Sequence, residues 1–155
     1  ETLDKAARIA WPGFTSFAKD AGSLYVLGRG PSFPIAQETA LKLKETCSIH
    51  AEAHSIAEVM HGPWELMQEG FPVLAYSPQD AAREITLDAV AKMRKAGAEV
   101  QVVGAGGLPF AESGHVLLDP VSMILTAYLE IEKVAAALGR DPDRPRLLRK
   151  VTETM

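Results

Sequence analysis

The segment from Ala40 to Pro63, ALKLKETCSIHAEAHSIAEVMHGP, concentrates side chains that can move protons. It holds three of the chain's four histidines, together with several carboxylates and lysines. These side chains are Lys42, Lys44, Glu45, His50, Glu52, His54, Glu58 and His61. Carboxylates and imidazoles are the usual general acids and bases, so the chemistry would be proton transfer. A solvated helix face could carry the same residues, and the elements that position them decide between the two interpretations.

Short apolar runs alternate with helical patterns along the chain. Strands are predicted at Leu24–Leu27, Val73–Tyr76, Val100–Val103 and, as HVLLD, residues 115–119. Helices are predicted at residues 79–96 and 120–138, with two short helices or one broken helix at 2–21 and a further helix whose first turn contains Pro34. This alternation predicts an α/β fold, a three-layer α-β-α sandwich with a mostly parallel sheet.

The turn after the first strand is glycine-rich, and it leads into the helix that carries the proton-moving residues. Ligands of parallel sheets gather at the carboxyl ends of the strands. We therefore expect Gly28, Arg29, Gly30 and Ser32 to bind substrate. The start of the Pro34 helix is placed at the same expected site.

Two faces can be drawn on that helix at 3.6 residues per turn. The apolar face contains Ala36, Ala40, Leu43 and Cys47. The charged face contains Glu38, Lys42 and Glu45, spaced i, i+4 and i+7. This charged face is either a solvated stripe with a favourable Glu38–Lys42 pair or the wall of a site.

Composition narrows the class of protein. The chain has 155 residues, which is about one domain, and its net charge of −4 does not suggest nucleic-acid binding. One cysteine, Cys47, cannot form an intramolecular disulfide or a cysteine-based zinc site, so a cytoplasmic setting is expected. No membrane span or signal peptide is visible, and the start at Glu1 in a helical pattern suggests a piece of a longer protein. We expect a helical lead-in at 1–22, the main domain at 23–139 and an active-site tail at 140–155.

The stretch LGRGPSFPIAQETALKLKETCSIHAEAHSIAEVMHGP resembles the second half of the isomerase domain of glucosamine-6-phosphate synthase. That domain has the sugar isomerase (SIS) fold. The elements GRG, ALKLKE, IHAEA and HGP stand in the family's order and spacing, and DRPRLLRKVTET resembles the family's C-terminal tail. The chain looks most similar to the two-SIS phosphosugar isomerases and deaminases that lack a glutaminase domain.

The resemblance implies a role for four side chains. Glu45 would be the base that moves a proton between C1 and C2 of an open-chain sugar, and Lys42 would favour its carboxylate form and stabilise charge on substrate oxygens. His61 would open the sugar ring, reaching into a neighbouring subunit, which implies a homodimer. Lys150 would lie over the carbonyl and form a Schiff base. Read without the resemblance, they are a solvent-facing carboxylate and its partner, a capping or packing histidine, and a surface lysine.

The family pattern is incomplete in this chain. No serine- and threonine-rich phosphate loop is present, because the matching loop YSPQDAARE offers only Ser77. Ser32, after Gly30, is a weak substitute. A preceding SIS half or another copy would have to supply the phosphate grip. We expect a phosphosugar isomerase or aminosugar-phosphate deaminase acting on the fructose 6-phosphate or glucosamine 6-phosphate class, without metal or cofactor. The alternatives are a non-catalytic phosphosugar sensor and a structural dimerisation half. His50 is expected to be buried in a turn, and His54 and His115 are given no role.

Overall fold

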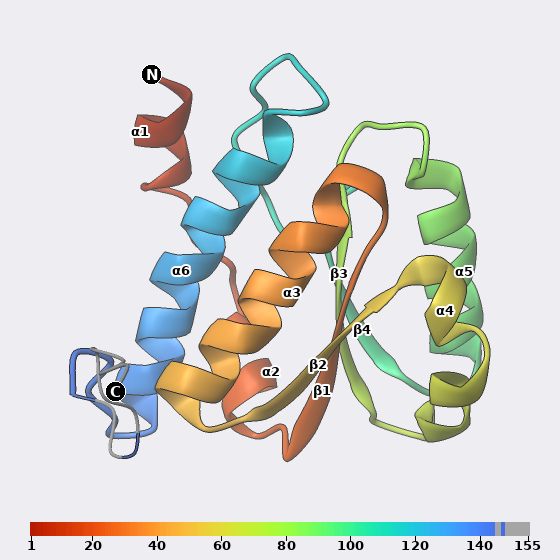
Figure 1. Cartoon of the computed structure of the whole chain (residues 1–155), viewed down its shortest axis with the longest axis horizontal. Coiled ribbons are helices and arrows are strands. Elements are labelled where there is room, and N and C mark those ends of the chain that lie inside the picture. Colours follow the sequence, from red (N-terminus) through yellow and green to blue (C-terminus); the bar gives the residue numbers. More distant parts are fainter. Residues whose placement is uncertain (145–146, 148–155) are drawn as a thin grey trace, which may run out of the picture.

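Four parallel strands form the centre of the chain in the computed structural model, which describes residues 1–144 and 147. The strands are β1 (Ser23–Gly28), β2 (His50–Ser55), β3 (Pro72–Ser77) and β4 (Glu99–Gly104). Their order in the sheet is β2-β1-β3-β4, and every neighbouring pair is parallel. The strands point upward in Figure 1, so the carboxyl edge of the sheet lies at the top.

Helices cover both faces of this sheet and complete three layers (Figure 1). One face carries α1 (Thr2–Ala6), α2 (Phe14–Lys19), α3 (Phe33–Lys42) and α6 (Asp119–Ala137). The other carries α4 (Ile56–Val59) and α5 (Arg83–Lys95). Shorter turns are η1 (Gly30–Ser32), the π-helical η2 (Leu43–Cys47) and η3 (Gly62–Leu66). The predicted three-layer sandwich is confirmed.

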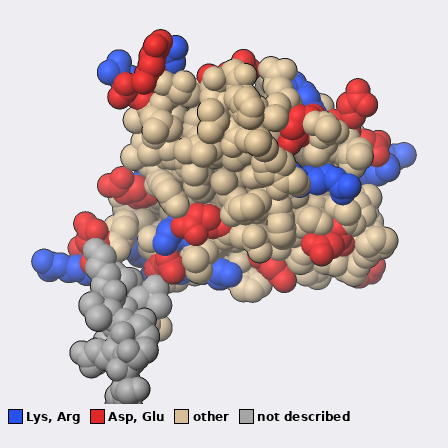
Figure 2. All heavy atoms as spheres, turned by 45° about the horizontal axis from the view of Figure 1, so that its top comes forward, with Lys and Arg blue, Asp and Glu red and all other residues tan. Residues whose placement is uncertain are grey.

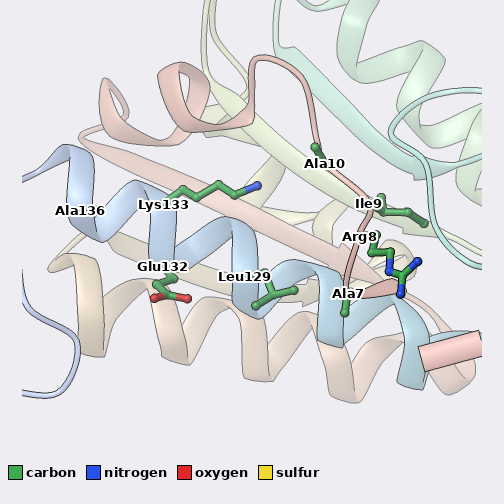
Figure 3. Close-up of a pocket in the computed structure, with 8 residues that line it drawn as sticks. All are labelled: Ala7, Arg8, Ile9, Ala10, Leu129, Glu132, Lys133 and Ala136. Carbon is green, nitrogen blue, oxygen red and sulfur yellow. The ribbon is translucent and has the colours of Figure 1, made fainter. Parts of the chain in front are cut away.

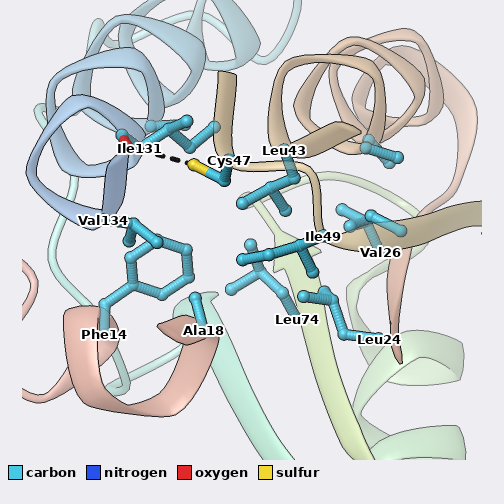
Figure 4. Close-up of a cluster of buried hydrophobic side chains, with 14 of the residues drawn as sticks. Phe14, Ala18, Leu24, Val26, Leu43, Cys47, Ile49, Leu74, Ile131 and Val134 are labelled. Atoms are coloured by element: carbon cyan, nitrogen blue, oxygen red, sulfur yellow. Dashed lines mark hydrogen bonds between the residues drawn. The ribbon is translucent and has the colours of Figure 1, made fainter. Parts of the chain in front are cut away.

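The larger hydrophobic core lies between the sheet and the layer of α3 and α6. Figure 4 shows Leu24, Val26 and Leu74 from the strands pointing toward side chains of α2, η2 and α6. A smaller core on the other face packs α4 and α5 against the sheet. Strands buried on both faces explain why β1 and β3 read as continuous apolar runs in the sequence.

The N-terminal segment joins the larger core. Trp11, Phe14 and Phe17 are buried in it, and the Thr126 hydroxyl of α6 donates a hydrogen bond to the Ala6 carbonyl at 3.0 Å. The lead-in therefore packs as part of the sandwich, while the boundary at residue 22 stays a prediction. Its two short helices follow one of the two predicted forms, with Gly13 preceding α2 in a left-handed conformation.

One predicted strand was wrong, and one strand of the sheet was missed. HVLLD forms a turn leading into α6, in which the His115 carbonyl accepts hydrogen bonds from the Leu118 and Asp119 amides. The strand β2 was not predicted, because HAEAHS combines small and charged residues with low strand propensity. The helix expected from residue 79 begins later, at Arg83, after a turn in which Asp80 accepts a hydrogen bond from the Ala82 amide.

Over the described residues, the chain has no helix with the length and apolar character needed to cross a membrane.

Gly28 ends β1 where the chain turns back over itself. A Cβ atom at this position would overlap the Ser32 carbonyl and would lie 2.9 Å from the Phe33 Cα. Only glycine fits there without moving the backbone that starts α3. The packing of the turn is therefore sufficient to explain this glycine.

We expect the substitution Gly28→Ala to lower the free energy of unfolding by about 1–3 kcal/mol, since the clash is with backbone. Gly22→Ala is the matched control, because a Cβ there meets nothing within 4 Å, and its effect should stay within about 0.5 kcal/mol. Urea unfolding of both variants measures the difference. Equal effects of the two substitutions would contradict the close-packed turn.

Candidate functional site at the end of α3

The last turn of α3 and the π-helical η2 bring three charged side chains together. The Lys42 Nζ lies 2.6 Å from Glu45 Oε2 and 3.6 Å from Glu38 Oε1. About one third of each side chain is exposed, with values between 31% and 34%. The charged face predicted from the sequence is thus present, and it is neither fully solvated nor buried.

Buried neighbours fix the turn that presents Glu45. Leu43 and Cys47 are buried in the larger core, and Figure 4 shows the Cys47 thiol directed at the Ile131 carbonyl of α6 at 3.6 Å. The Thr46 hydroxyl donates to the Lys42 carbonyl at 2.8 Å, and Ser48 ends the turn in a left-handed conformation. Single π-helical turns within α-helices are frequent at functional sites.

The arrangement leaves one oxygen of Glu45 available. Its Oε2 is held by Lys42, whereas Oε1 makes no hydrogen bond to any residue that the structure describes. A carboxylate held in this way can accept a proton through its free oxygen, and the neighbouring ammonium can stabilise negative charge on a bound molecule. The pair can therefore carry out proton transfer from carbon.

Tyr128 of α6 joins this group, and the sequence did not reveal it. Its hydroxyl donates a hydrogen bond to Glu38 Oε1 at 2.9 Å, although 90 residues separate the two in the chain. Burial, the hydrogen bond to Glu38 and the Glu38 charge raise the pKa of Tyr128, and Lys42 lowers it. The hydrogen bond that Lys42 donates to Glu45, together with the Glu45 and Glu38 charges, raises the pKa of Lys42 against the opposing effect of burial. Lys42 therefore stays charged at neutral pH.

The predicted substrate-binding turn lies at the other end of α3. Gly28, Arg29, Gly30 and Ser32 are at the carboxyl edge of the sheet, whereas Glu45 is 13 residues further along the helix, roughly 20 Å at the helical rise. Figure 1 shows α3 descending from the carboxyl edge to its lower end beside α6. Within one chain the turn at the carboxyl edge and the Lys42–Glu45 pair are therefore apart, and substrate binding by this turn stays a prediction.

The carboxyl edge carries the polar side chains of Arg29, Ser32, Ser77 and Asp80. The Ser32 hydroxyl donates to the Arg29 carbonyl at 2.9 Å and accepts from the Arg29 amide at 3.0 Å, so it serves the local turn. Ser77 is buried, and its hydroxyl has no hydrogen-bond partner among residues 1–144. A hollow at this edge is lined by Arg29, Gly30, Pro31, Asp80, Ala81, Ala82, Ile85 and Val116. Figure 2, turned to bring this edge forward, shows a broad uncharged area in its upper middle.

The histidines of the segment Ala40–Pro63 do not lie beside Glu45. His50 starts β2, is exposed, and has its Nδ1 3.0 Å from the Ser23 hydroxyl, so its expected burial in a turn was wrong. His54 packs edge-on against Tyr25 with ring centroids 4.7 Å apart, and Tyr25 belongs to the smaller core. Side chains alternate across a strand, so Ala51 faces the larger core instead.

His61 also lies on the far side of the sheet from Glu45. It follows α4, whose Ile56 and Val59 belong to the smaller core, whereas Leu43 and Cys47 belong to the larger one. His61 is exposed and makes no side-chain cap to η3. The capping and packing alternatives for this histidine therefore find no support, and it does not meet Glu45 within one chain.

Lys150 lies outside the described residues. The chain before it leaves α6 beside η2: the ends of α3 and α6 lie side by side in Figure 1, and Ile131 contacts Cys47. The Arg140 charge acts on the Cys47 thiol, whose pKa is raised chiefly by burial. The described chain thus runs toward the tail from the end of the sandwich that carries Glu45.

A further hollow lies between residues 7–10 and α6. Figure 3 shows that the charged ends of Arg8, Glu132 and Lys133 point in different directions around it. The Lys133 ammonium is already held by Glu130 at 2.6 Å. These groups do not converge on a common point, and the end of α3 remains the stronger candidate.

Known proteins match both the sequence and the fold. The family model described as the SIS domain matches residues 18–106. A glutamine–fructose-6-phosphate aminotransferase (isomerizing) from Aeropyrum pernix is 39% identical, covering 87% of this chain and 24% of that protein. The chain thus spans about a quarter of the length of such curated relatives.

Solved structures extend the likeness. A protein assigned as a phosphosugar isomerase from Silicibacter pomeroyi is 41% identical, with a TM-score of 0.85 over 92% of this chain and 45% of that one. Glucosamine-6-phosphate deaminase from Thermotoga maritima is 25% identical, with a TM-score of 0.71 over 90% of this chain and 46% of that one. The resemblance read from the sequence is confirmed.

The contacts of Tyr128 predict how its phenol titrates. Glu38→Gln should lower the pKa of Tyr128, because it removes the negative charge that disfavours the phenolate. Lys42→Met should raise it, because the ammonium favours the phenolate. NMR titration of ring-labelled tyrosines checks both directions, with Tyr25 on the other face of the sheet as the internal control. Shifts of equal sign in the two variants would contradict the described geometry.

Proposed function

Because this chain belongs to the SIS domain family, we propose that it is the catalytic half of a phosphosugar aldose–ketose isomerase or aminosugar-phosphate deaminase. The observation that carries the proposal is the Lys42–Glu45 pair, 2.6 Å apart on a π-helical turn that the core holds in place. The substrate class is a hexose 6-phosphate such as fructose 6-phosphate or glucosamine 6-phosphate. The names of related isomerising and deaminating proteins support this class.

The proposed reaction is a proton transfer between neighbouring carbons. The free oxygen of Glu45 takes the proton from C1 or C2 of the open-chain sugar, and the electron pair of that C–H bond forms the enediol or enolamine. Lys42 stabilises the negative charge that develops on the substrate oxygens. Glu45 then returns the proton to the adjacent carbon while the hydroxyl proton passes from one substrate oxygen to the other, so that no electrons leave the sugar and no redox cofactor is required.

His61 would act in a neighbouring subunit. Its place on the other side of the sheet from Glu45 agrees with an active site shared across a homodimer. An exposed imidazole can pass a proton between the ring oxygen and the anomeric hydroxyl. In this arrangement each complete site takes Glu45 from one subunit and His61 from the next.

Lys150 would complete the site from the tail. It follows Arg144 by six positions, a length that spans up to roughly 20 Å when extended. Since the chain leaves α6 beside η2, a lysine at this distance can reach the sugar carbonyl and form the Schiff base. The phosphate grip is assigned to a preceding SIS half or a second copy, because Ser32 is committed to its own turn.

The lack of a serine- and threonine-rich phosphate loop in this chain favours a second function, a phosphosugar sensor. A phosphosugar sensor of this fold would bind without turnover and would not need the Lys42–Glu45 geometry. It predicts binding that survives the loss of Glu45. The two functions therefore separate in one experiment.

We expect the chain to catalyse deuterium incorporation at C1 or C2 of fructose 6-phosphate or glucosamine 6-phosphate in D₂O. Glu45→Gln should slow this exchange by at least about a hundredfold, as is typical on loss of a general base. Glu84→Gln, an exposed carboxylate on α5, is the matched control and should exchange at the parent rate. Proton NMR follows the loss of the carbon-bound proton. Equal exchange by parent and Glu45→Gln would refute the assignment of the base, and perturbed sugar signals without exchange would favour the sensor.

The shared site predicts complementation between two inactive variants. Glu45→Gln and His61→Ala should each be inactive as homodimers, and mixing after subunit exchange should restore about one quarter of the parent activity. This value follows because half of the random dimers are mixed and each of these has one intact site. No recovery, with heterodimers verified by mass spectrometry, would contradict a site built from two subunits.

A further inference from the structure

We propose that Tyr128 is a positioning residue that holds Lys42 against Glu45 by fixing Glu38, an inference that rests on the proposed role of Glu45 as base. The contacts form a continuous chain across two helices. The Tyr128 hydroxyl binds Glu38 Oε1 at 2.9 Å, Glu38 Oε1 lies 3.6 Å from Lys42 Nζ, and Lys42 Nζ lies 2.6 Å from Glu45 Oε2.

The position of the Lys42 ammonium needs a further contact, because an ion pair with Glu45 alone does not fix it. A lysine ammonium is a point charge on a flexible four-carbon stem, and partly exposed ion pairs contribute only about 0–1 kcal/mol. Glu38 and Glu45 lie on either side of Lys42 along the helix and compete for the same ammonium. Without a further contact, Lys42 would exchange between the two carboxylates.

Tyr128 decides this competition in favour of Glu45. Its hydroxyl donates to the same Glu38 oxygen that faces Lys42, so it occupies a lone pair and withdraws charge from that oxygen. The observed distances agree, since the ammonium is 1.0 Å closer to Glu45 than to Glu38. Glu38 then acts as a second, weaker partner that limits the motion of Lys42.

The position of Tyr128 suits it for this task. It lies on α6 next to Ala127, which is fully buried, and one turn before the buried Ile131, whose carbonyl receives the Cys47 thiol. The helix that anchors η2 therefore also carries the phenol. The Tyr128 side chain is 39% exposed, and its partial burial together with the hydrogen bond to Glu38 and the Glu38 charge raises its pKa, so the phenol keeps its proton and remains a donor at neutral pH.

The first test measures the position of Lys42 without any turnover. The order parameter of the Lys42 Cε, from carbon-13 relaxation, should fall in Tyr128→Phe, which removes only the hydroxyl. Tyr25→Phe is the matched control, since Tyr25 is buried on the other face of the sheet and its loss of a hydroxyl should leave Lys42 unchanged. An equally ordered Lys42 in Tyr128→Phe would overturn the inference, whatever the activity of the protein.

The second test asks whether Tyr128 acts through Lys42. In the exchange assay, Tyr128→Phe should lower kcat by about tenfold with little change in KM, as expected for a lost hydrogen bond to a charged group. In a Lys42→Met background the same change should alter kcat by less than about twofold. An undiminished tenfold effect there would overturn the inference. If the parent shows no exchange, the proposed function fails and the order parameter alone decides the role of Tyr128.

Discussion

The attachment of η2 to α6 is the contact on which the proposed site depends. Leu43 and Cys47 are buried in the larger core, and the Cys47 thiol meets the Ile131 carbonyl. These contacts hold the last turn of α3 in its π-helical form and turn Lys42 and Glu45 outward, one third exposed. Their attraction alone contributes little to stability at such exposure, so the core and not the ion pair determines the geometry. The same helix, α6, supplies Tyr128 and leads toward the tail that contains Lys150.

The fold could be predicted where most residues of an element are buried. β1, β3 and the apolar part of β4 appear in the sequence as short apolar runs, and α6 as a long, mostly apolar helix, because most of their residues pack in the cores. The edge strand β2 could not be recognised, since it contains no large apolar residue and its two faces meet different layers. HVLLD was mistaken for a strand because Val116, Leu117 and Leu118 are apolar, yet all three are exposed in a turn. An apolar segment therefore indicates a strand only when helices of the sandwich cover that segment.

The candidate site was predicted in part. Contacts between residues close in the sequence could be predicted, and contacts between distant segments could not. Glu38, Lys42 and Glu45 follow one another along a helix, so their proximity could be read from spacing. The contribution of Tyr128 could not, because it depends on how α6 crosses α3. The rule that ligands bind at the carboxyl edge pointed to Gly28 and Ser32, whereas the charged pair lies at the opposite end of α3. Gly28 shows how a motif residue can have a packing explanation that is sufficient by itself.

We propose that substrate meets this chain at the end of α3 and not at the carboxyl edge of the sheet. Backbone amide shifts during titration with fructose 6-phosphate or glucosamine 6-phosphate test it most directly, because they locate the ligand even if turnover is absent. We expect the largest shifts between Lys42 and Ile49, with smaller ones at Glu38 and Tyr128. Shifts confined to residues 28–32 and 80–82, with none in η2, would contradict it.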